Sequence, residues 1–429
     1  MKQLPLFLLF AAASLSAAGL TLPRARELAL QNNPGIVEAA ERIRAAEARL
    51  AQARSAFLPT VAANAGYQQL DIRQHSDDFP ERIGNLAFDQ YTFGIQGSWL
   101  LFNGFAREAT HAAAQEGVLG AEEGRREAER LILKAVTIAF HQAQLARENM
   151  LIATRDQEFN ENLHADALKR YQAEQVAEAT VLNFRIRTIQ AKTTRLAAER
   201  SFRLAGTVLA ELMALPRAEL PADLQPVPAG EEPPNHLPDL DAQIERALAA
   251  RPDLRAIEAG IRAAEEQVRA ARGAHWPTLA LTAGYDYEHV RHLAPFNLNN
   301  KTSHVGVVAV WDIFAGGLHE GAIAEAKAQV RQLAQQRQRL ILAIAAELRQ
   351  YHDSAEVALA TLVLQQEACE LSARVRDDVQ KAYQAGSTTL TRLNEAQTDL
   401  VRAEGSLAAA RIQLRQIIEE FQLAAGTAR

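Results

Sequence analysis

The chain has 429 residues, a formal net charge of −6 and few aromatic residues. This length leaves room for two or three domains, and the mildly acidic balance argues against a nucleic-acid partner. The sequence contains no glycine-rich phosphate loop, no HExxH motif, no paired metal-ligand cysteines and no GxSxG elbow, so we expect neither enzymatic activity nor a cofactor. Long alanine-rich, charged and periodic runs predict long helices, none of them apolar enough to span a membrane.

The N-terminal segment, residues 1–18, is typical of a cleaved secretory signal. It has one basic residue, Lys2, followed by an apolar run over 4–15 and small residues over 17–19. An ordinary buried helix is the alternative. The single cysteine, Cys369, lies far from the predicted cleavage site in a helical pattern, where we expect a buried small residue. We therefore expect no lipid anchor attached through an N-terminal cysteine.

One long stretch occurs twice, at a constant separation of 218 residues. Pro34 corresponds to Pro252, and Tyr67 corresponds to Tyr285. A repeat of this length indicates a duplicated half-protein, since solenoid repeats are much shorter. We therefore expect a first structural repeat over 20–215 and a second over 239–426. Between them, seven prolines over 216–238 exclude a regular helix. This connector either packs around the outside of the helices or forms a flexible linker.

Each repeat begins with a helical heptad pattern that breaks at a proline. In the first repeat, Thr21 is expected to cap a helix that begins at Leu22. After an interruption at 32–34, the helix continues to Phe57, and Pro59 ends it where a strand begins. Large and small apolar residues alternate along the heptad seam, which favours closely packed coiled-coil helices.

Four strands with one apolar face are predicted, two in each repeat. In the first repeat a polar loop over 71–90 separates the two strands. Each strand has about 11 residues, the length that a tilted strand needs to cross a bilayer. Asp286, Glu288 and Asp312 lie on the polar faces and would line a lumen. The apolar faces carry aromatic residues towards their ends, as lipid-facing strands do near headgroups, namely Tyr67, Tyr91, Trp99, Tyr285 and Trp311. The alternative is a soluble sheet packed on the helices.

Four strands cannot close a barrel by themselves. An open sheet edge in lipid would leave backbone groups without hydrogen-bond partners, so spanning requires more than one chain. Two chains would give a minimal barrel filled by side chains, whereas three would give twelve strands and a lumen. The strand pattern does not choose between these two.

A very long helical run follows the second strand of each repeat. The runs begin after WLLFNG (99–104) and WDIFAGG (311–317), and we predict helices over 106–168 and 318–382. Each run meets a similar turn motif, YQAEQVAEATVLN (171–183) or YQAGSTTLTRLN (383–394). After the second turn the chain returns with heptad spacing from Leu393 to Ala424.

The signal, the order of elements, the two corners and the paired turn motifs together resemble the TolC family of outer-membrane efflux and secretion channels. The resemblance implies an α+β membrane protein with duplicated halves that forms a trimer. Its transmembrane β-barrel takes four strands from each protomer, and a long α-helical coiled-coil barrel crosses the periplasm. It also implies passive transport in a tripartite efflux pump or a type I secretion system, with a periplasmic adaptor and an inner-membrane pump as partners. A periplasmic coiled-coil scaffold or adaptor without a channel is the alternative, and the substrate, whether drug, metal or protein, stays open.

The resemblance places the periplasmic entrance and the adaptor-binding tip at the two turns. The corresponding residues are Tyr171, Thr180, Asn183, Tyr383, Gly386, Arg392 and Glu395. Many relatives carry an aspartate where this chain has Arg392, which argues against a strongly cation-selective acidic ring. Arg392 and Glu395 are spaced to pair on one helix. The alternative is a solvated surface pair of little energetic weight.

Two histidines near the end of the third predicted strand raise the question of a metal site. His289 and His292 lie beside Glu288 near a predicted loop, but residues 289 and 292 of an extended chain point to opposite faces. Because a metal site needs convergent ligands, we expect no metal site here.

Overall fold

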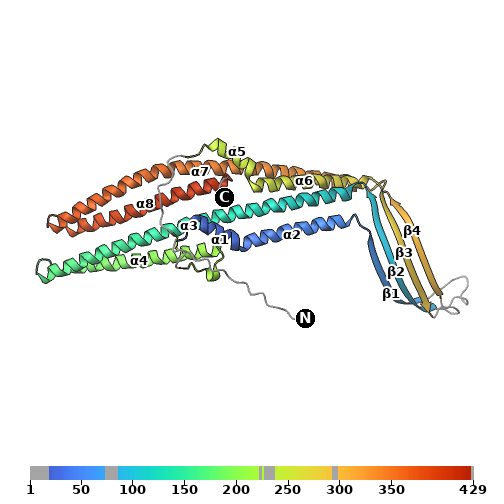
Figure 1. Ribbon diagram of the computed structural model, residues 1–429, viewed down its shortest axis with the longest axis horizontal. Coiled ribbons are helices and arrows are strands. Elements are labelled where there is room, and N and C mark those ends of the chain that lie inside the picture. Colours follow the sequence, from blue (N-terminus) through green and yellow to red (C-terminus); the bar gives the residue numbers. More distant parts are fainter. Residues whose placement is uncertain (1–18, 73–85, 222–224, 227–236, 292–297, 427–429) are drawn as a thin grey trace. The chain divides into compact units, whose positions relative to one another are not determined.

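The computed structural model describes residues 19–72, 86–221, 225–226, 237–291 and 298–426 (Figure 1). The predicted secretory signal over 1–18 lies outside these residues. The chain divides into two compact units, which we describe separately. The helical unit comprises Met1–Ala39, Arg125–Arg251 and Ile341–Arg429, and the sheet unit comprises Ala40–Gly124 and Pro252–Leu340.

The sheet unit contains a four-stranded antiparallel sheet in the order β1-β2-β3-β4. The strands are β1 (Thr60–Ile72), β2 (Leu86–Asn103), β3 (Thr278–Arg291) and β4 (Leu298–Val310). All are longer than predicted, and β1 and β2 extend into the predicted loop over 71–90. The reason is backbone pairing, which continues to Ile72 and Leu86 where the side chains alone suggested a loop.

Strict alternation along β2 fails near its end. The register between β2 and β3 shifts between Leu100 and Phe102, which leaves Leu101 as the extra residue of a β-bulge. Phe102, not Leu101, therefore lies opposite Leu279 of β3. Simple alternation along β2 therefore does not assign Leu101 to either face.

The helices of the two halves correspond one to one. Their bounds are α1 (Leu22–Asn32) and α5 (Leu240–Ala250), α2 (Pro34–Ser55) and α6 (Pro252–Arg272), α3 (Ala106–Gln172) and α7 (Leu318–Gln384), and α4 (Glu178–Leu212) and α8 (Leu390–Ala424). Both α3 and α7 have 67 residues, and both α4 and α8 have 35. From the second strand of each half onwards, equivalent residues are 212 positions apart. None of the described helices combines the length and the apolar character needed to cross a membrane.

Helix α1 begins at Leu22 as predicted, but its cap differs from the prediction. The Thr21 side chain makes no capping hydrogen bond. Its backbone carbonyl instead accepts a hydrogen bond from the Ala25 N–H at 2.9 Å. Short 3-10 helices, η1 (Pro216–Ala218) and η3 (Gly273–His275), follow α4 and α6.

A tryptophan ties the end of each strand pair to the residues that precede the first strand of that pair. The Trp99 indole N–H donates to the Phe57 carbonyl at 3.0 Å, and the Trp311 indole N–H donates to the His275 carbonyl at 3.1 Å. Gly104, at the first corner, has a left-handed φ of 65°. A Cβ there would lie 2.3 Å from the Gly273 carbonyl oxygen, so only glycine permits this approach.

Heptad positions form the core of the helical unit. One cluster lies between α7 and α8 and consists of Ala358, Leu362, Ala410, Leu414 and Ile418. A second joins α1, α3 and α4 around Leu20, Ala25, Ala29, Val136, Ala139, Phe140, Ala143, Leu209 and Met213. Ala410 and Leu414 of the first cluster belong to the predicted heptad seam of the last helix.

The described part of the connector packs on these helices. The Leu20 N–H donates to the Gln225 carbonyl at 2.8 Å, and the Arg147 side chain donates to the Pro226 carbonyl. Pro226 is fully buried. These contacts support the packed alternative for residues 225–226, whereas 222–224 and 227–236 lie outside the described residues.

Three charged side chains meet inside the helical unit. Glu347 of α7 lies 2.8 Å from the Arg251 guanidinium and 3.1 Å from the Lys134 ammonium. Burial raises the pKa of Glu347, but hydrogen bonds from the two cations outweigh it, and the pKa lies below its ordinary value. One helical turn further on, the Tyr351 hydroxyl donates to Glu420 of α8 at 2.9 Å. The network therefore joins α3, α7, α8 and the residue that follows α5.

Candidate functional site

The two helical turns close with the same backbone geometry but with different residues. After α3, Glu174 adopts a left-handed φ of 58°, and after α7, Gly386 adopts a φ of 75°. In both turns a following N–H returns to a carbonyl of the last helical turn: Gln175 to Arg170 and Ser387 to Ala382, each at 2.9 Å. Such bonds satisfy carbonyls that the helix leaves open. The first tip achieves this without glycine.

The two tips, both in the helical unit, contact each other through aromatic side chains. The rings of Phe184 and Tyr383 lie edge to face, with centroids 6.3 Å apart. Burial raises the pKa of Tyr383. The nearby Arg170 opposes this shift, and Asp166 adds to it. Its counterpart Tyr171 is exposed. Of the two predicted tip tyrosines, only Tyr383 takes part in this contact.

The predicted pair at the second tip forms an ion pair. The Arg392 guanidinium lies 3.5 Å from the Glu395 carboxylate, and both side chains are more than half exposed. Thr389 caps α8, because its hydroxyl accepts from the Arg392 N–H at 3.3 Å. The equivalent residues of the first tip, Thr180 and Asn183, are uncharged. The tips are therefore electrically different, although their backbones match.

A polar contact between α3 and α8 was not predicted. The Gln397 side chain of α8 donates to Asp156 of α3 at 2.8 Å, within a groove that Asn160 and Asn394 also line. Gln397, Asn160 and Asn394 are buried. Buried amides beside an apolar seam are the sequence signal that could have revealed this site, since such groups require hydrogen-bond partners.

Asp286 and Glu288 lie on the face opposite the paired aromatic residues, as the alternation predicted. Asp89, by contrast, lies on the aromatic face and accepts a hydrogen bond from the Tyr67 hydroxyl at 3.0 Å. Asp286 lies opposite Gly94, and Glu288 lies opposite Thr92, on one face. The Asp286 carboxylate occupies the space above Gly94, where a Cβ would approach it to 2.4 Å. The Gln90 side chain donates to Glu288. A face with interlinked polar groups is suited to water.

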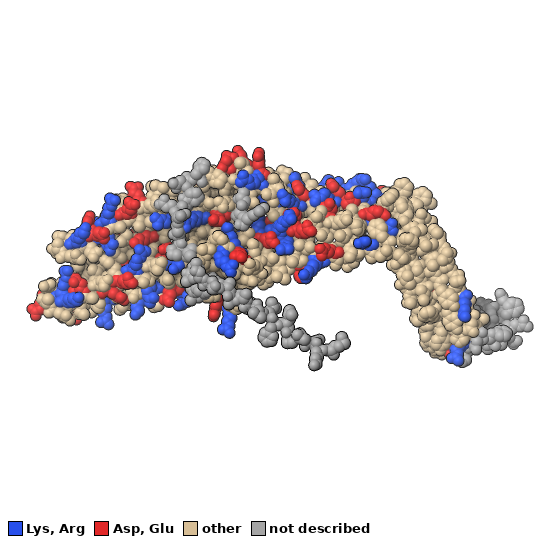
Figure 2. Space-filling model, in the orientation of Figure 1, with Lys and Arg blue, Asp and Glu red and all other residues tan. Residues whose placement is uncertain are grey.

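The opposite face of the sheet is apolar and exposed. Tyr67 pairs with Tyr91, with ring centroids 5.1 Å apart, and Ile95 pairs with Tyr285. Figure 2 shows that the sheet carries few charged residues on the side in view, whereas the helices carry many of both signs. The exposed large apolar residues of this face are Val61, Tyr67, Tyr91, Phe93, Ile95, Trp99, Tyr285, Val305 and Val307. Leu298, Val308 and Val310 are also exposed but lie on the face of Asp286 and Glu288.

Two predicted strand residues lie outside the sheet. Strand β4 ends at Val310, so the assignment of Trp311 and Asp312 to a strand is wrong. The chain turns there towards α7, and strand alternation does not place Asp312 on the polar face. His289 lies in β3 opposite Tyr91, two residues before the strand ends at Arg291. His292 lies outside the described residues.

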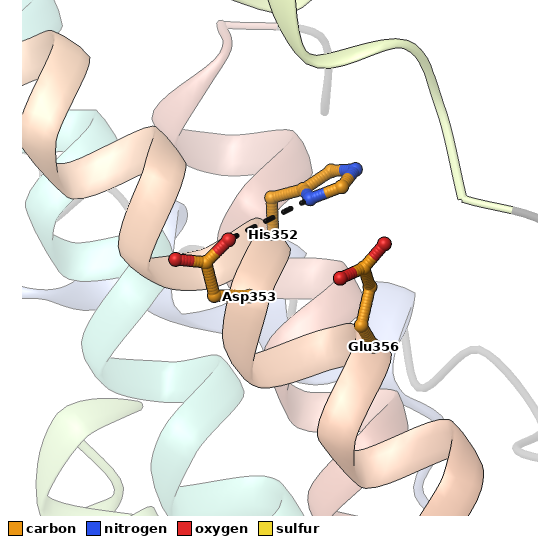
Figure 3. A group of neighbouring side chains, drawn as sticks. All are labelled: His352, Asp353 and Glu356. Atoms are coloured by element: carbon orange, nitrogen blue, oxygen red, sulfur yellow. Dashed lines mark ion pairs between the residues drawn. The ribbon is translucent and has the colours of Figure 1, made fainter.

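A group of potential metal ligands lies on α7. His352, Asp353 and Glu356 bring ligand atoms within 4.8 Å of one another, and His352 Nδ1 lies 4.0 Å from Asp353 Oδ1 (Figure 3). All three come from one helix, and Asp353 and Glu356 are exposed. Single-helix carboxylates that face water do not enclose a cation, and within the described part of the chain no second element supplies a ligand. We assign no metal to this group.

Comparison with known proteins gives the family. The sequence matches the outer membrane efflux protein family over residues 25–214 and 243–427. It is 26% identical over 314 residues to CyaE of Bordetella pertussis, covering 73% of this chain and 64% of that protein. It is 26% identical over 395 residues to the pyoverdine export outer membrane protein OpmQ of Pseudomonas aeruginosa, covering 90% and 80%.

Solved structures share the fold at lower sequence identity. The CmeC outer membrane channel of Campylobacter jejuni aligns with a TM-score of 0.79 at 17% identity, covering 95% of this chain and 85% of that one. The MtrE outer membrane channel of Neisseria gonorrhoeae aligns with a TM-score of 0.75 at 20% identity, covering 98% and 94%. With its family match over both duplicated halves, the chain belongs to the outer membrane efflux protein family.

Proposed function

We propose that this protein is the outer-membrane channel of a tripartite efflux pump or type I secretion system. It conducts substrates passively from an inner-membrane pump to the outside. The observation that carries the proposal is the sheet, which has an apolar and a polar face and contains only four strands per chain. In a member of an outer-membrane family, the apolar face meets lipid and the polar face lines water.

Three copies complete the channel. In the described sheet, β1 and β4 each pair on one side only, and such edges are not tolerated in lipid. Three chains supply twelve strands and leave a lumen, whereas two would give a barrel small enough to be filled by its own side chains. The similarity to solved outer membrane channels supports the trimer.

The helical unit then forms the periplasmic portion, with the tips as the entrance and adaptor-binding region. The tip residues are Tyr171, Thr180, Asn183, Tyr383, Gly386, Arg392 and Glu395. A periplasmic adaptor and the inner-membrane pump are the partners. Residues 1–18 direct export, and the connector over 216–238 joins the two repeats, 20–215 and 239–426.

The test is extraction from outer membranes in detergent, followed by native mass spectrometry and single-channel recording in a planar bilayer. We expect three chains per particle and steady ion conductance. Ile95→Lys places a charge on the apolar face and costs about 2–4 kcal/mol near the bilayer midplane, so trimer yield should fall. The matched variant Thr92→Lys places the same charge on the polar face, opposite Glu288, and should assemble. A particle that is soluble without detergent and does not conduct would overturn the channel in favour of a periplasmic scaffold.

A further inference from the structure

The first residues after the predicted secretory signal are buried in the helical unit. Leu20 lies two positions beyond residues 1–18 and is 1% exposed. Its side chain belongs to the apolar cluster that joins α1, α3 and α4. Its N–H donates to the Gln225 carbonyl at 2.8 Å. Chain ends are poorly ordered unless contacts tie them down, and Leu20 is tied down through both its side chain and its backbone.

The connector supplies the other half of this contact. Leu20 and Pro226 form a parallel bridge, and both side chains are fully buried. The Pro226 carbonyl also accepts a hydrogen bond from the Arg147 side chain of α3. The start of the first repeat and the described part of the connector are thereby held together against α3. We call Leu20, Gln225 and Pro226 the N-terminal docking site.

The second half of the chain has no equivalent of this docking site. The residue that corresponds to Leu20, 218 positions later, is Pro238. Pro238 is only partly buried, and the connector precedes it without a break in the chain. The docking site is therefore not a contact inherited through the duplication. It belongs to the end of the chain where the signal is removed.

One polar atom of the docking site lacks a partner. Gln225 Oε1 is buried and accepts no hydrogen bond within the described part of the chain. The amide is oriented, because its Nε2 donates to the Pro221 carbonyl at 3.4 Å. Buried acceptors generally have donors. Cleavage before Gly19 would create an α-amino group, with up to three N–H donors in place of one, a single residue from the hydrogen bond between Leu20 and Gln225.

The spacing along the chain decides when the docking site can form. The predicted apolar run of the signal ends at Leu15, so residues 16–19 join it to Leu20. Fully extended, this segment spans about 14 Å, of which the headgroup layer of a bilayer takes about 5–8 Å. The remainder is less than the diameter of one helix, about 10–12 Å. While the signal stays in the membrane, Leu20 therefore cannot be surrounded by α3, α4 and the connector.

We propose that the helical unit carries a docking site for its own processed N-terminus. Hydrolysis of the Ala18–Gly19 peptide bond by a signal-processing protease frees Leu20 to enter the cluster. Water supplies the hydroxyl group of the new Ala18 carboxyl and the proton of the new Gly19 amine. That amine donates to Gln225 Oε1. The proposal rests on residues 1–18 acting as the export signal, as in the proposed function, and adds that their removal completes the core.

This dependence orders the maturation of the exported chain. A precursor held in the inner membrane lacks the contacts of Leu20 and Pro226, so α1 and the connector do not complete their packing on α3. Cleavage both releases the chain and permits that packing. The helical unit is thus kept from reaching its final structure until the chain has left the inner membrane.

Labelling of the mature α-amine tests the docking. The full-length chain is isolated from cell envelopes and treated with N-hydroxysuccinimidyl acetate near pH 7, where α-amines react ahead of lysines because their ordinary pKa is lower. We expect a mature chain that begins at Gly19. Its α-amine should react at least about tenfold more slowly in the folded protein than in urea, since reaction requires local opening. Gln225→Ala should raise the folded-state rate, whereas the matched variant Gln31→Ala, at an exposed amide of α1, should not.

Two uncleaved precursors test the effect of the membrane tether. Ala17→Gln with Ala18→Gln replaces the small residues that cleavage requires, so the signal stays attached. The second precursor carries the same substitutions and a flexible spacer of about 20 Gly and Ser residues before Gly19, whose mean span of about 25 Å exceeds a helix diameter. Trypsin is added to spheroplasts. We expect digestion within the helical unit of the first precursor, and resistance equal to that of the mature chain in the second.

Each outcome decides the proposal. A mature chain that does not begin at Gly19, or an α-amine that reacts equally fast in folded and unfolded protein, would overturn the docking site. Equal trypsin sensitivity of the two precursors would overturn the effect of the tether. None of these readouts depends on conductance. A mature protein that docks its N-terminus but does not form a channel would therefore overturn the proposed function and leave this inference standing.

Discussion

The two halves of the chain have the same backbone but different surroundings. Phe140, His141 and Gln144 of α3 are buried beneath α1 and the connector, whereas their counterparts on α7 are the partly exposed His352 and the exposed Asp353 and Glu356. Likewise, α8 exposes none of its large apolar side chains, whereas its counterpart α4 exposes several, among them Leu182 and Leu196. The comparison teaches that duplication preserves element lengths, while burial depends on which neighbours each half meets. A position that is exposed in one half can then carry a charged residue there, as Asp353 and Glu356 do on α7.

The charged network around Glu347 has no duplicated counterpart, because the residue of α3 that is equivalent to Glu347 is Ala135. Glu347→Ala would remove the carboxylate that pairs with Lys134 and with Arg251, which is 4% exposed. We expect a loss of up to about 3–5 kcal/mol in the free energy of unfolding, the usual cost of breaking a buried ion pair by removing one partner. Urea unfolding measures it. The exposed pair of Arg44 with Glu41 provides the control, and an equal loss in Glu41→Ala would refute the argument.

The contrast between α8 and α4 predicts unequal effects of the same substitution. Leu414 is fully buried on α8, so Leu414→Ala should cost about 2–5 kcal/mol of unfolding free energy. Leu196 of α4 is half exposed, and Leu196→Ala should change unfolding of a single copy by about 0.5 kcal/mol or less. Equal unfolding losses would remove the distinction between the two helices.

The two tips differ in how they accommodate a left-handed residue. Gly386→Ala places a Cβ at a φ of 75° and should destabilise the protein by about 1 kcal/mol. Glu174 already bears this strain at a φ of 58°, so Glu174→Gly should be neutral or stabilise by about 0.5 kcal/mol. Thermal unfolding of both variants measures the difference. A loss of stability in Glu174→Gly would show that its side chain contributes more than its backbone costs.

The buried His141 predicts a pH dependence that its exposed counterpart position does not share. Burial lowers the pKa of His141, with Glu419 opposing and Arg415 and Arg26 adding to the shift. The unfolded chain therefore binds a proton that the folded chain resists, and stability should fall as the pH drops below about 6.5. His141→Gln should flatten this slope in unfolding measured between neutral and mildly acidic pH. Asp353→His, at the exposed position, should leave the slope unchanged.

The ion pair at the second tip should affect stability least. Arg392 and Glu395 are mostly exposed, so replacing both with alanine should cost about 0.5 kcal/mol or less. If this tip forms the narrow entrance, the same variant should change single-channel conductance or gating. Replacing Thr180 and Asn183 with alanine provides the control at the uncharged tip. Unchanged currents in the Arg392 and Glu395 variant would contradict their placement at the entrance.

Local patterns predicted most of the elements. The break at Pro34, the strand after Pro59, the long helices and the heptad seam from Leu393 to Ala424 all occur in the structure. The errors lie where pairing or a turn overrides side-chain pattern. The bulge at Leu101, the extension of β1 to Ile72 and the end of β4 at Val310 depend on hydrogen bonds to other strands. Composition within one segment carries no information about those bonds.

By itself, the sequence determined the duplication, the element order and the two-faced strands, because periodicity and proline act over a few residues. It also placed Arg392 and Glu395 close enough to pair, since helix geometry alone brings residues three apart together. Only the tertiary structure decided which equivalent surfaces are buried. Phe184 meets Tyr383 and Asp156 meets Gln397 across hundreds of residues, and such long-range contacts bury Leu414 of α8 but not Leu196 of α4.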